Sequence, residues 1–273
     1  MRKVFATGSY DDIRSRQVRF LEETSRFGEL TILLWPDEVV CELEGKPPKF
    51  PLAERIYLLQ ALRYVSTVTV WEMPVKRDAL PYPDGIKPDL WIVDEASDND
   101  QKKAYCASYG ISYHVIKDED LRGWPIQRFD ALKEPSSPKR VIVTGSFDWL
   151  HSGHVRFLEE VSQLGDLYVA VGHDANIQLL KGLGHPMFSQ DERRYMVQAV
   201  RYVKQALITS GKGWMDAEPE IELLKPDIYV VNEDGDVPEK RAFCEKLGMR
   251  YIVLKRSPKE GLPRRESTVL RGF

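Results

Sequence analysis

Apolar runs of strand length alternate with amphipathic stretches along the second half of the chain. VIVTG at 141–145, DLYVAVG at 166–172 and DIYVVN at 227–232 are typical of buried strands. VRFLEEVSQLG at 155–165 has helical spacing and a glycine stop. Such alternation predicts a parallel sheet covered by helices on both faces, in which ligands bind beyond the carboxyl ends of the strands.

The two halves of the chain resemble each other in sequence. GSYDDIRSRQVRFLEE at 8–23 and GSFDWLHSGHVRFLEE at 145–160 share ten identities. KPDLWIVDE at 87–95 also matches KPDIYVVNE at 225–233. We therefore expect two tandem Rossmann-like αβα sandwich domains with parallel sheets, packed on each other as a pseudo-dimer.

A short segment between the two halves is typical of a linker. KEPSSPKR at 133–140 combines prolines and serines with charged residues. We expect a degenerate domain over 1–132, a linker over 133–139 and a catalytic domain over 140–273. The chain would then be a monomer with an internal pseudo-dimer, or a homodimer.

Composition narrows the class of protein. The chain has 273 residues, a formal net charge of −3 and 42% hydrophobic residues, enough for two domains with their own cores. No basic excess favours nucleic acid, and no apolar run is long enough to span a membrane. Met1 is not followed by a signal-peptide pattern, and three cysteines leave an odd thiol without metal spacing. We expect a soluble cytoplasmic protein that binds neither nucleic acid nor membrane.

Two histidines and two glycines stand where the strand at 141–145 meets the following helix. Gly145 and Gly153 allow backbone to approach a ligand closely, and a helix N-terminus presents N–H groups that suit phosphate. His151 and His154 share one face of the first helical turn and can point at that ligand. Zinc is a competing interpretation, but no further ligand has a useful spacing. Structural roles, with His151 as a helix cap and His154 in the core, are the other alternative.

GSFDWLHSGHVRFL at 145–158 resembles the GxFDxxHxGHxxxL signature of the nucleotidyltransferases of the cytidylyltransferase type. In that family the two histidines stabilise the charge that develops on the nucleotide α-phosphate during in-line attack. The resemblance implies this catalytic role for His151 and His154. It implies a nucleotide-binding role for the other motif residues, with the aspartate orienting a histidine or placing Mg²⁺. These residues are Gly145, Ser146, Phe147, Asp148 and Gly153.

Later segments fit the same family in the same order. Lys181 stands where the family carries a lysine directed at the phosphates, and RYV at 201–203 resembles a segment of cytidylyltransferases. ESTVLRGF at 266–273 resembles the late STxxR motif, whose residues hold the leaving pyrophosphate. Asn232 is the candidate that reads the base. The implied phosphate ligands near the end of the chain are Arg265, Ser267, Thr268 and Arg271.

Two further arginines and one glycine-rich segment have other interpretations. Arg193 and Arg194 fall within an expected helix, where we place them on a solvated face rather than on phosphate. TSGKGW at 209–214 invites a P-loop interpretation, which we reject because Gly213 replaces the required Ser or Thr.

The first half lacks the motif residues. Arg14, Arg16 and Gln17 replace His151, Gly153 and His154, and Glu44 replaces Lys181. We expect a catalytically silent copy in which the two arginines are free cations that could bind a regulator. The tandem layout resembles that of phosphoethanolamine cytidylyltransferase, although there the degenerate half comes second.

The sequence thus predicts a nucleotidyltransferase that uses CTP with Mg²⁺. It would transfer CMP to a small phosphorylated alcohol, polyol or sugar and release pyrophosphate, without a metal site built from protein ligands. An adenylyltransferase that uses ATP is the first alternative. A non-catalytic nucleotide-binding regulatory protein is the alternative from another class.

Overall fold

The computed structural model describes residues 1–71, 76–80, 85, 87–125, 132–133 and 135–270. These residues form two compact units, Met1–Gly123 and Trp124–Phe273. Each unit is an α/β structure around one parallel sheet of five strands, so the expected Rossmann-like class is confirmed. The expected domain bounds and the pseudo-dimer packing stay predictions.

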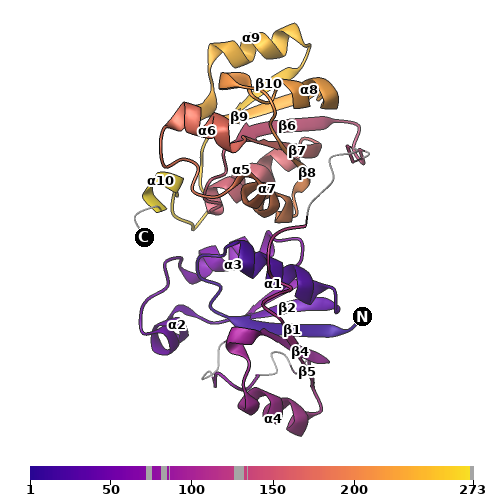
Figure 1. The fold of residues 1–273 in the computed structure, drawn as a ribbon, viewed down its shortest axis with the longest axis vertical. Helices are drawn as coiled ribbons and strands as arrows, with labels where there is room; N and C mark the ends of the chain where they lie inside the picture. The colour runs from indigo at the N-terminus through magenta and orange to yellow at the C-terminus, as the bar shows by residue number, and fades with distance from the viewer. Residues whose placement is uncertain (72–75, 81–84, 86, 126–131, 134, 271–273) are drawn as a thin grey trace. The chain divides into compact units, whose positions relative to one another are not determined.

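The first unit places its first strand in the middle of the sheet. The strand order is β3-β2-β1-β4-β5, and every pair is parallel. Figure 1 shows how strands and helices alternate along this unit. The elements are β1 (Lys3–Gly8), α1 (Ser15–Ser25), β2 (Glu29–Leu34), α2 (Asp37–Glu44), α3 (Leu52–Gln60), β3 (Thr67–Val70), β4 (Leu90–Asp94), η2 (Glu95–Ser97), α4 (Asp100–Tyr109) and β5 (Ser112–Ile116).

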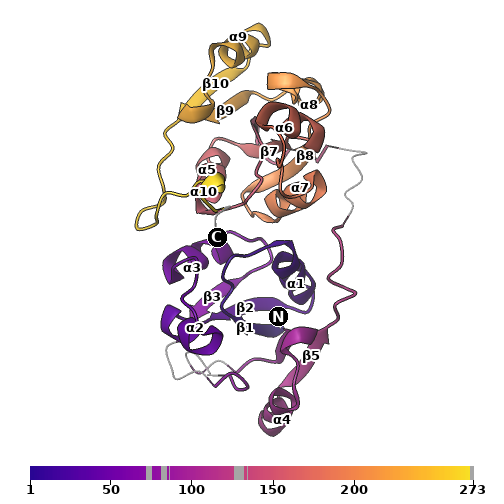
Figure 2. The same cartoon turned by 60° about the vertical axis from the view of Figure 1, so that its left-hand side comes forward.

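The second unit has the same arrangement. Its order is β10-β9-β6-β7-β8, again parallel throughout, and helices flank the sheet in Figure 2. The elements are β6 (Arg140–Gly145), α5 (Ser152–Ser162), β7 (Asp166–Val171), α6 (Asp174–Lys181), α7 (Gln190–Ala199), β8 (Val203–Ile208), η3 (Gly213–Met215), α8 (Glu218–Leu224), β9 (Ile228–Asn232), η4 (Glu233–Gly235), α9 (Pro238–Lys246), β10 (Arg250–Leu254) and α10 (Ser267–Leu270).

The strand order fixes where a ligand can bind. In the second unit the chain moves from β6 outward to β7 and β8, then crosses back to β9 on the other side of β6. The loops after β6 and β9 therefore diverge, and they leave a crevice at their carboxyl ends. In the first unit β1 and β4 form the equivalent switch point.

Helix α5 illustrates how the sequence pattern becomes packing. Val155, Leu158 and Val161 recur at helical spacing and are buried. Each buried aliphatic side chain contributes about 1.5–3 kcal/mol relative to an exposed one. Because this face is fixed against the sheet, the first turn of α5 is held over the carboxyl end of β6.

Arg193 and Arg194 do not lie on a solvated helix face, so that expectation is wrong. Both side chains are buried, and Arg193 is only 1% exposed. The Arg193 guanidinium donates to the carbonyl oxygens of Ser146 and Gly172 at 2.6 and 2.7 Å. It thereby joins the ends of β6 and β7, a role that its charge alone did not reveal.

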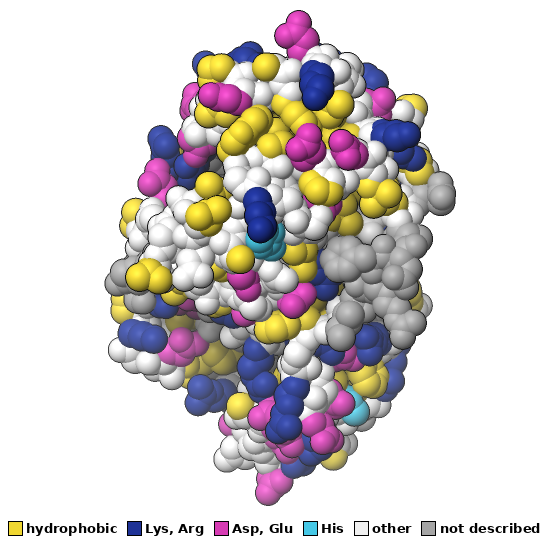
Figure 3. Space-filling model, turned by 45° about the horizontal axis from the view of Figure 1, so that its top comes forward, with side chains coloured by type: hydrophobic (Ala, Val, Ile, Leu, Met, Phe, Trp, Pro, Cys, Tyr) yellow, Lys and Arg dark blue, Asp and Glu magenta, His cyan; other side chains and the backbone are white. Residues whose placement is uncertain are grey.

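The surface agrees with the near-balanced charge of the chain. On the face drawn in Figure 3, Lys and Arg side chains are interspersed with Asp and Glu side chains. Within the described part of the chain, no helix combines the length and the apolar character that crossing a membrane requires.

Candidate active site

A cavity of about 520 Å³ lies in the second unit at the switch point. Its walls come from the ends of β6 and β9, the first turn of α5, the end of α6 and the residues around α10. Volumes of this size suit a ligand as large as a nucleotide. The cavity lining includes most of the residues that the sequence singled out, namely Gly145, Ser146, Phe147, His151, Gly153, His154, Lys181, Asn232, Ser267 and Thr268.

The turn after β6 depends on glycine. Phe147 has a φ of +48°, a left-handed conformation that bends the chain sharply toward α5. Its ring then lies against Gly145, where an added Cβ would be 2.9 Å from Phe147 Cε2. A larger residue at 145 would push this ring out of place and open the floor of the cavity.

Asp148, which the sequence assigned to nucleotide binding, is not among the described residues that line the cavity, and it holds a neighbouring loop instead. Its buried carboxylate accepts the backbone N–H groups of Met187 and Phe188 at 2.7 and 3.1 Å. His185 also lies 3.6 Å from the second carboxylate oxygen. The carboxylate thus orders residues 185–188, and its expected role in orienting a histidine or placing Mg²⁺ stays a prediction.

His151 is both a helix cap and a candidate ligand. It is the N-cap residue of α5, and its Nδ1 accepts the backbone N–H of Gly153 at 3.1 Å. Because Nδ1 is an acceptor, the neutral ring carries its proton on Nε2, which makes Nε2 a donor. The capping role, first considered as an alternative to function, therefore selects the tautomer that a phosphate ligand needs.

Gly153 provides the room for this cap. A Cβ at position 153 would stand 3.0 Å from His151 Cε1 and 3.1 Å from its Nδ1. A side chain there would push the imidazole by a few tenths of an ångström and distort its hydrogen bond to the helix terminus. The glycine between the two histidines is thus explained by the close approach of the first ring to the backbone.

His154 lies against His151 and is neutral. The two rings are stacked, with centroids 4.0 Å apart. Burial, followed by the nearby cations Arg256 and Lys181, lowers the pKa of His154 to about 4. A neutral imidazole can donate one hydrogen bond without the desolvation cost that a buried charge carries.

Lys181 reaches the site from the last residue of α6. Its Nζ lies 2.9 Å from Ser146 Oγ, and it lines the same cavity as the two histidines. The ammonium group and the two imidazoles therefore surround one region above the end of β6. An anion placed there would meet a cation and ring N–H donors together.

Arg256, which the sequence analysis missed, is a further cation of this cavity. It follows β10 and lines the site, where its guanidinium pairs with Asp234 at 2.6 Å and donates to the backbone oxygen of Arg265 at 3.3 Å. A basic residue directly after a strand of a parallel sheet was the signal that could have identified it. Asp118 stands at the equivalent position of the first unit.

The residues expected to hold pyrophosphate are only partly described. Ser267 begins α10 and lies with Oγ 3.4 Å from the backbone oxygen of Trp149. Arg265 lines a smaller basic hollow beside the main cavity, which shares Gly153 and Arg256 with it. Arg271 lies outside the described residues.

The two sides of the cavity differ in character. Asn232 ends β9 and Arg256 follows β10, both on one side of β6. Ile177, Leu180 and Trp214 line the other side, which follows β7 and β8. Trp214 is 51% exposed and was also missed, because a lone tryptophan after a strand carries no motif.

The described residues contain no group of three His, Cys, Asp or Glu side chains that could hold a metal ion. Of the carboxylates near the site, Asp148 orders a loop and Asp234 is paired with Arg256. Three cysteines are free, and two of them, Cys106 and Cys244, are buried. Asp216 and Glu266 also line the cavity, and Mg²⁺ in such sites is commonly bound through one or two carboxylates together with substrate phosphates.

The expectation that Arg14 and Arg16 of the first unit are free cations is wrong. Arg14 pairs with Asp12, and Arg16 lies 2.6 Å from Asp118 and 3.8 Å from Asp94. Carboxylates that flank the same turn and strand ends neutralise both guanidinium groups, so neither is available to attract an anion.

Comparison with known proteins places the second unit. The family model described as cytidylyltransferase-like matches residues 142–265. The chain is 37% identical over 119 residues to the FAD synthase of Aciduliprofundum boonei, covering 42% of this chain and 76% of that protein. It is 39% identical over 119 residues to the FAD synthase of Pyrococcus horikoshii, covering 42% and 78%.

Among solved structures, the lipopolysaccharide core biosynthesis protein from Thermoplasma volcanium GSS1 is similar at 27% identity with a TM-score of 0.37. That match covers 45% of this chain and 98% of the other.

Proposed function

This chain belongs to the cytidylyltransferase-like family of nucleotidyltransferases, and from that premise we propose that its second unit is an adenylyltransferase. It would transfer AMP from ATP to the terminal phosphate of a small acceptor and release pyrophosphate. The observation that carries this proposal is the pair of stacked, neutral imidazoles facing Lys181 above the end of β6.

The choice of ATP revises the expectation of CTP. The relatives named above are FAD synthases, and FAD contains an adenylyl group. Asn232, at the end of β9, can donate and accept hydrogen bonds, so its amide is compatible with either base. Similarity to FAD synthases therefore supports adenylyl transfer over cytidylyl transfer.

The reaction needs positioning and charge stabilisation more than covalent help. A phosphate oxygen of the acceptor attacks the α-phosphorus, and the bond from that phosphorus to the oxygen of the leaving pyrophosphate breaks. No proton has to be removed from an ionised phosphate nucleophile. His151 and His154 would donate to the oxygens of the α-phosphate, and Lys181 would bridge the α-phosphate and the acceptor phosphate.

The leaving pyrophosphate would lie on the basic side of the cavity. Arg256 joins Ser267 and Thr268 there, and Arg265 adds charge from the adjoining hollow. We include Arg271 among the pyrophosphate ligands because it is the arginine of the STxxR motif. Donors aimed at a developing charge are each worth about 2.7–4 kcal/mol of transition-state stabilisation.

The acceptor would occupy the apolar side. Ile177, Leu180 and the exposed Trp214 line the cavity with apolar side chains on the side of Lys181. An indole and aliphatic side chains suit an acceptor with an aromatic ring better than the bare polyol or sugar that the sequence analysis favoured. Together with the FAD synthase relatives, this makes FMN the first acceptor to test.

Mg²⁺ would enter with the nucleotide. Magnesium is commonly bound through substrate phosphates and retained waters rather than by an all-protein cage, which agrees with the lack of a metal-ligand cluster among the described residues. Bound in this way it would neutralise part of the triphosphate charge, while the donors of the chain orient the α-phosphate.

Pyrophosphate release tests the proposal. The full chain is incubated with FMN and Mg²⁺ and with ATP, CTP, GTP or UTP, and pyrophosphate is measured over time. Release with ATP that His154→Gln abolishes is the expected result; His154→Gln copies Gln17 of the first unit. Release with CTP in place of ATP would overturn the adenylyl assignment.

A thermal unfolding series separates binding from turnover. ATP at about a hundred times its dissociation constant should stabilise the protein by roughly 2.7 kcal/mol. No stabilisation by any nucleotide, and no pyrophosphate with FMN or other phosphorylated acceptors, would favour a non-catalytic role instead.

A further inference from the structure

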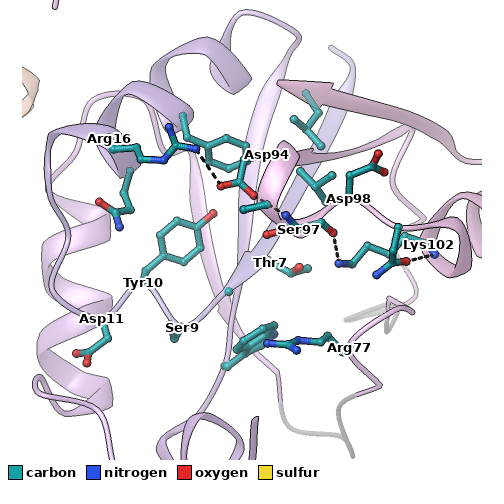
Figure 4. A pocket seen from close by; sticks show the side chains of 18 of the residues that line it. Thr7, Ser9, Tyr10, Asp11, Arg16, Arg77, Asp94, Ser97, Asp98 and Lys102 are labelled. Carbon is teal, nitrogen blue, oxygen red and sulfur yellow. Dashed lines mark hydrogen bonds and ion pairs between the residues drawn. The ribbon is translucent and has the colours of Figure 1, made fainter. Parts of the chain in front are cut away.

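The first unit keeps a cavity at its own switch point. It has a volume of about 410 Å³ and lies at the carboxyl ends of β1 and β4, as the close view in Figure 4 shows. This is the position that the candidate active site occupies in the second unit. A cavity that persists after the motif residues have been replaced needs an explanation of its own.

Two of the residues assigned to phosphate in the second unit are replaced in this cavity, although Arg16, Arg77 and Lys102 still line it. Glu44 stands in place of Lys181, and Gln17 in place of His154. The Arg16 side chain enters where Gly153 leaves space, and its charge is paired with Asp118. The lining therefore mixes carboxylates, near the end of α2 and the end of β4, with cations, and it differs in charge pattern from the site in the second unit.

Tyr10 supplies a hydroxyl that the catalytic copy lacks. Its side chain is 9% exposed, and its hydroxyl makes no hydrogen bond with any residue that the structure describes. Figure 4 shows the hydroxyl directed toward Asp94 and the cavity. Burial, then the charge of Asp94, raises the pKa of Tyr10, so the group is a neutral donor. The equivalent residue is Phe147, with the same left-handed backbone.

Asp94 supplies an acceptor opposite that donor. It ends β4, and its Oδ1 accepts the backbone N–H of Ser97 at 3.0 Å. Its Oδ2 is 3.8 Å from the Arg16 guanidinium, and 27% of the side chain is exposed. A carboxylate has about four lone-pair sites, so acceptor capacity is left for a ligand. In the catalytic copy the equivalent residue is Asn232.

Trp35 changes the shape of the wall. It lines the cavity at the position of Gly172 and is buried, and its Nε1 makes no hydrogen bond to a described residue. The cavity thus combines an aromatic wall, a neutral phenol donor and a carboxylate acceptor. Acidic side chains at the carboxyl end of a Rossmann-type strand are suited to accept hydrogen bonds from a diol.

We propose that this cavity binds a ligand with a vicinal diol. Asp94 accepts hydrogen bonds from the diol, Tyr10 donates to one of its oxygens, and Trp35 packs against the rest of the ligand. The diol can belong to a ribonucleoside or to a free polyol. This site is separate from the transfer reaction and does not depend on its assignment.

Calorimetric titration of the full chain tests the proposal with adenosine, ribitol and 2′-deoxyadenosine as probes. Adenosine or ribitol is expected to bind, and which of them binds identifies the source of the diol. If adenosine is the ligand, 2′-deoxyadenosine should bind at least about tenfold more weakly. It lacks the 2′-hydroxyl, so the carboxylate of Asp94 is left without a hydrogen-bond donor. Equal binding of the two nucleosides, or no binding of any probe, would overturn the proposal.

Variants assign the signal to this cavity rather than to the second unit. Asp94→Asn and Tyr10→Phe copy the residues of the catalytic half, so both are compatible with the fold. Asp94→Asn should weaken binding about tenfold or more, and Tyr10→Phe several-fold. Asp100→Asn, at a fully exposed carboxylate of α4, is the matched control and should change nothing. Unaltered binding by Asp94→Asn would contradict the assignment.

Discussion

The imidazole rings of His151 and His154 are stacked, with 22° between their planes and 4.0 Å between their centroids. The first ring is fixed by its cap on α5, and it in turn limits how the second can rotate. Two donors are thus pre-organised toward one region before any nucleotide binds. Pre-organisation of this kind favours stabilisation of a transition state over ground-state binding.

His154→Ala should lower turnover at least about a hundredfold, with a modest change in nucleotide affinity, because the lost donor acts on charge that develops during transfer. Steady-state kinetics with ATP and the acceptor measure both quantities. Gln17→Ala, at the equivalent position of the first unit, is the control and should leave turnover as it is. An unchanged turnover number for His154→Ala would refute the role given to this ring.

The depressed pKa of His154 predicts a pH dependence of stability. The pKa is about 4 in the folded chain and near 6.5 in the unfolded one, so between these values only the unfolded chain binds the proton. The free energy of unfolding should therefore rise with pH across that window and fall on acidification from 6.5 to 4. The ring is only partly buried, so the effect is at most about 3 kcal/mol.

Urea unfolding at several pH values measures this contribution. His154→Gln removes the titrating group. The free energy of unfolding of this variant should therefore depend less steeply on pH between 4 and 6.5 than that of the native chain. The same slope in both proteins would show that His154 keeps its ordinary pKa in the folded state.

Much of the fold could be predicted because strand and helix patterns are local. VIVTG gives β6, and the apolar spacing of 155–165 gives α5, which the structure bounds at Ser152–Ser162. The parallel sheet follows from the alternation of these elements. The position of the site follows as well, since loops at the carboxyl ends of adjacent strands meet wherever the order of strands reverses.

Residues whose role depends on tertiary contacts could not be predicted in the same way. Arg193 was placed on a solvated face because a charged residue in a helix is usually exposed, whereas here backbone carbonyls at two strand ends surround it. Arg16 was taken as free because its partner Asp118 is far away in sequence. Arg256 and Trp214 carry no motif, and only the strand order brings them to the cavity.

We expect Gly153→Ala to destabilise the protein, although glycine-to-alanine substitutions within helices usually stabilise it. Alanine in a helix is normally more stable than glycine by about 0.5–1 kcal/mol. At position 153 the added Cβ would stand 3.0 Å from His151 Cε1, so the ring must shift by a few tenths of an ångström and its cap on α5 is distorted. We expect a loss of up to about 1 kcal/mol in stability, the worth of an N-cap, together with a loss of turnover. Chemical unfolding and steady-state kinetics check the two effects, and a more stable, fully active variant would contradict the account.

Arg193 and Arg55 offer a matched comparison of the two units. Arg193 donates to the carbonyl oxygens of Ser146 and Gly172, and Arg55 donates to those of Ser9 and Trp35 at 2.6 and 2.9 Å. Lysine keeps the charge but cannot reproduce the planar fork, so Arg→Lys leaves buried carbonyls without donors. Each substitution should cost about 1–3 kcal/mol of stability in its own unit.

The two variants should differ in activity. Arg193→Lys loosens the turn that carries Ser146 beside Lys181, so turnover should fall even at temperatures where the protein remains folded. Arg55→Lys should lower the unfolding midpoint of the first unit and leave the turnover of the folded protein unchanged. Circular dichroism melts combined with pyrophosphate release distinguish these outcomes. Equal losses of turnover in both variants would show that the end of β1 contributes to the reaction, against the assignment of the chemistry to the second unit alone.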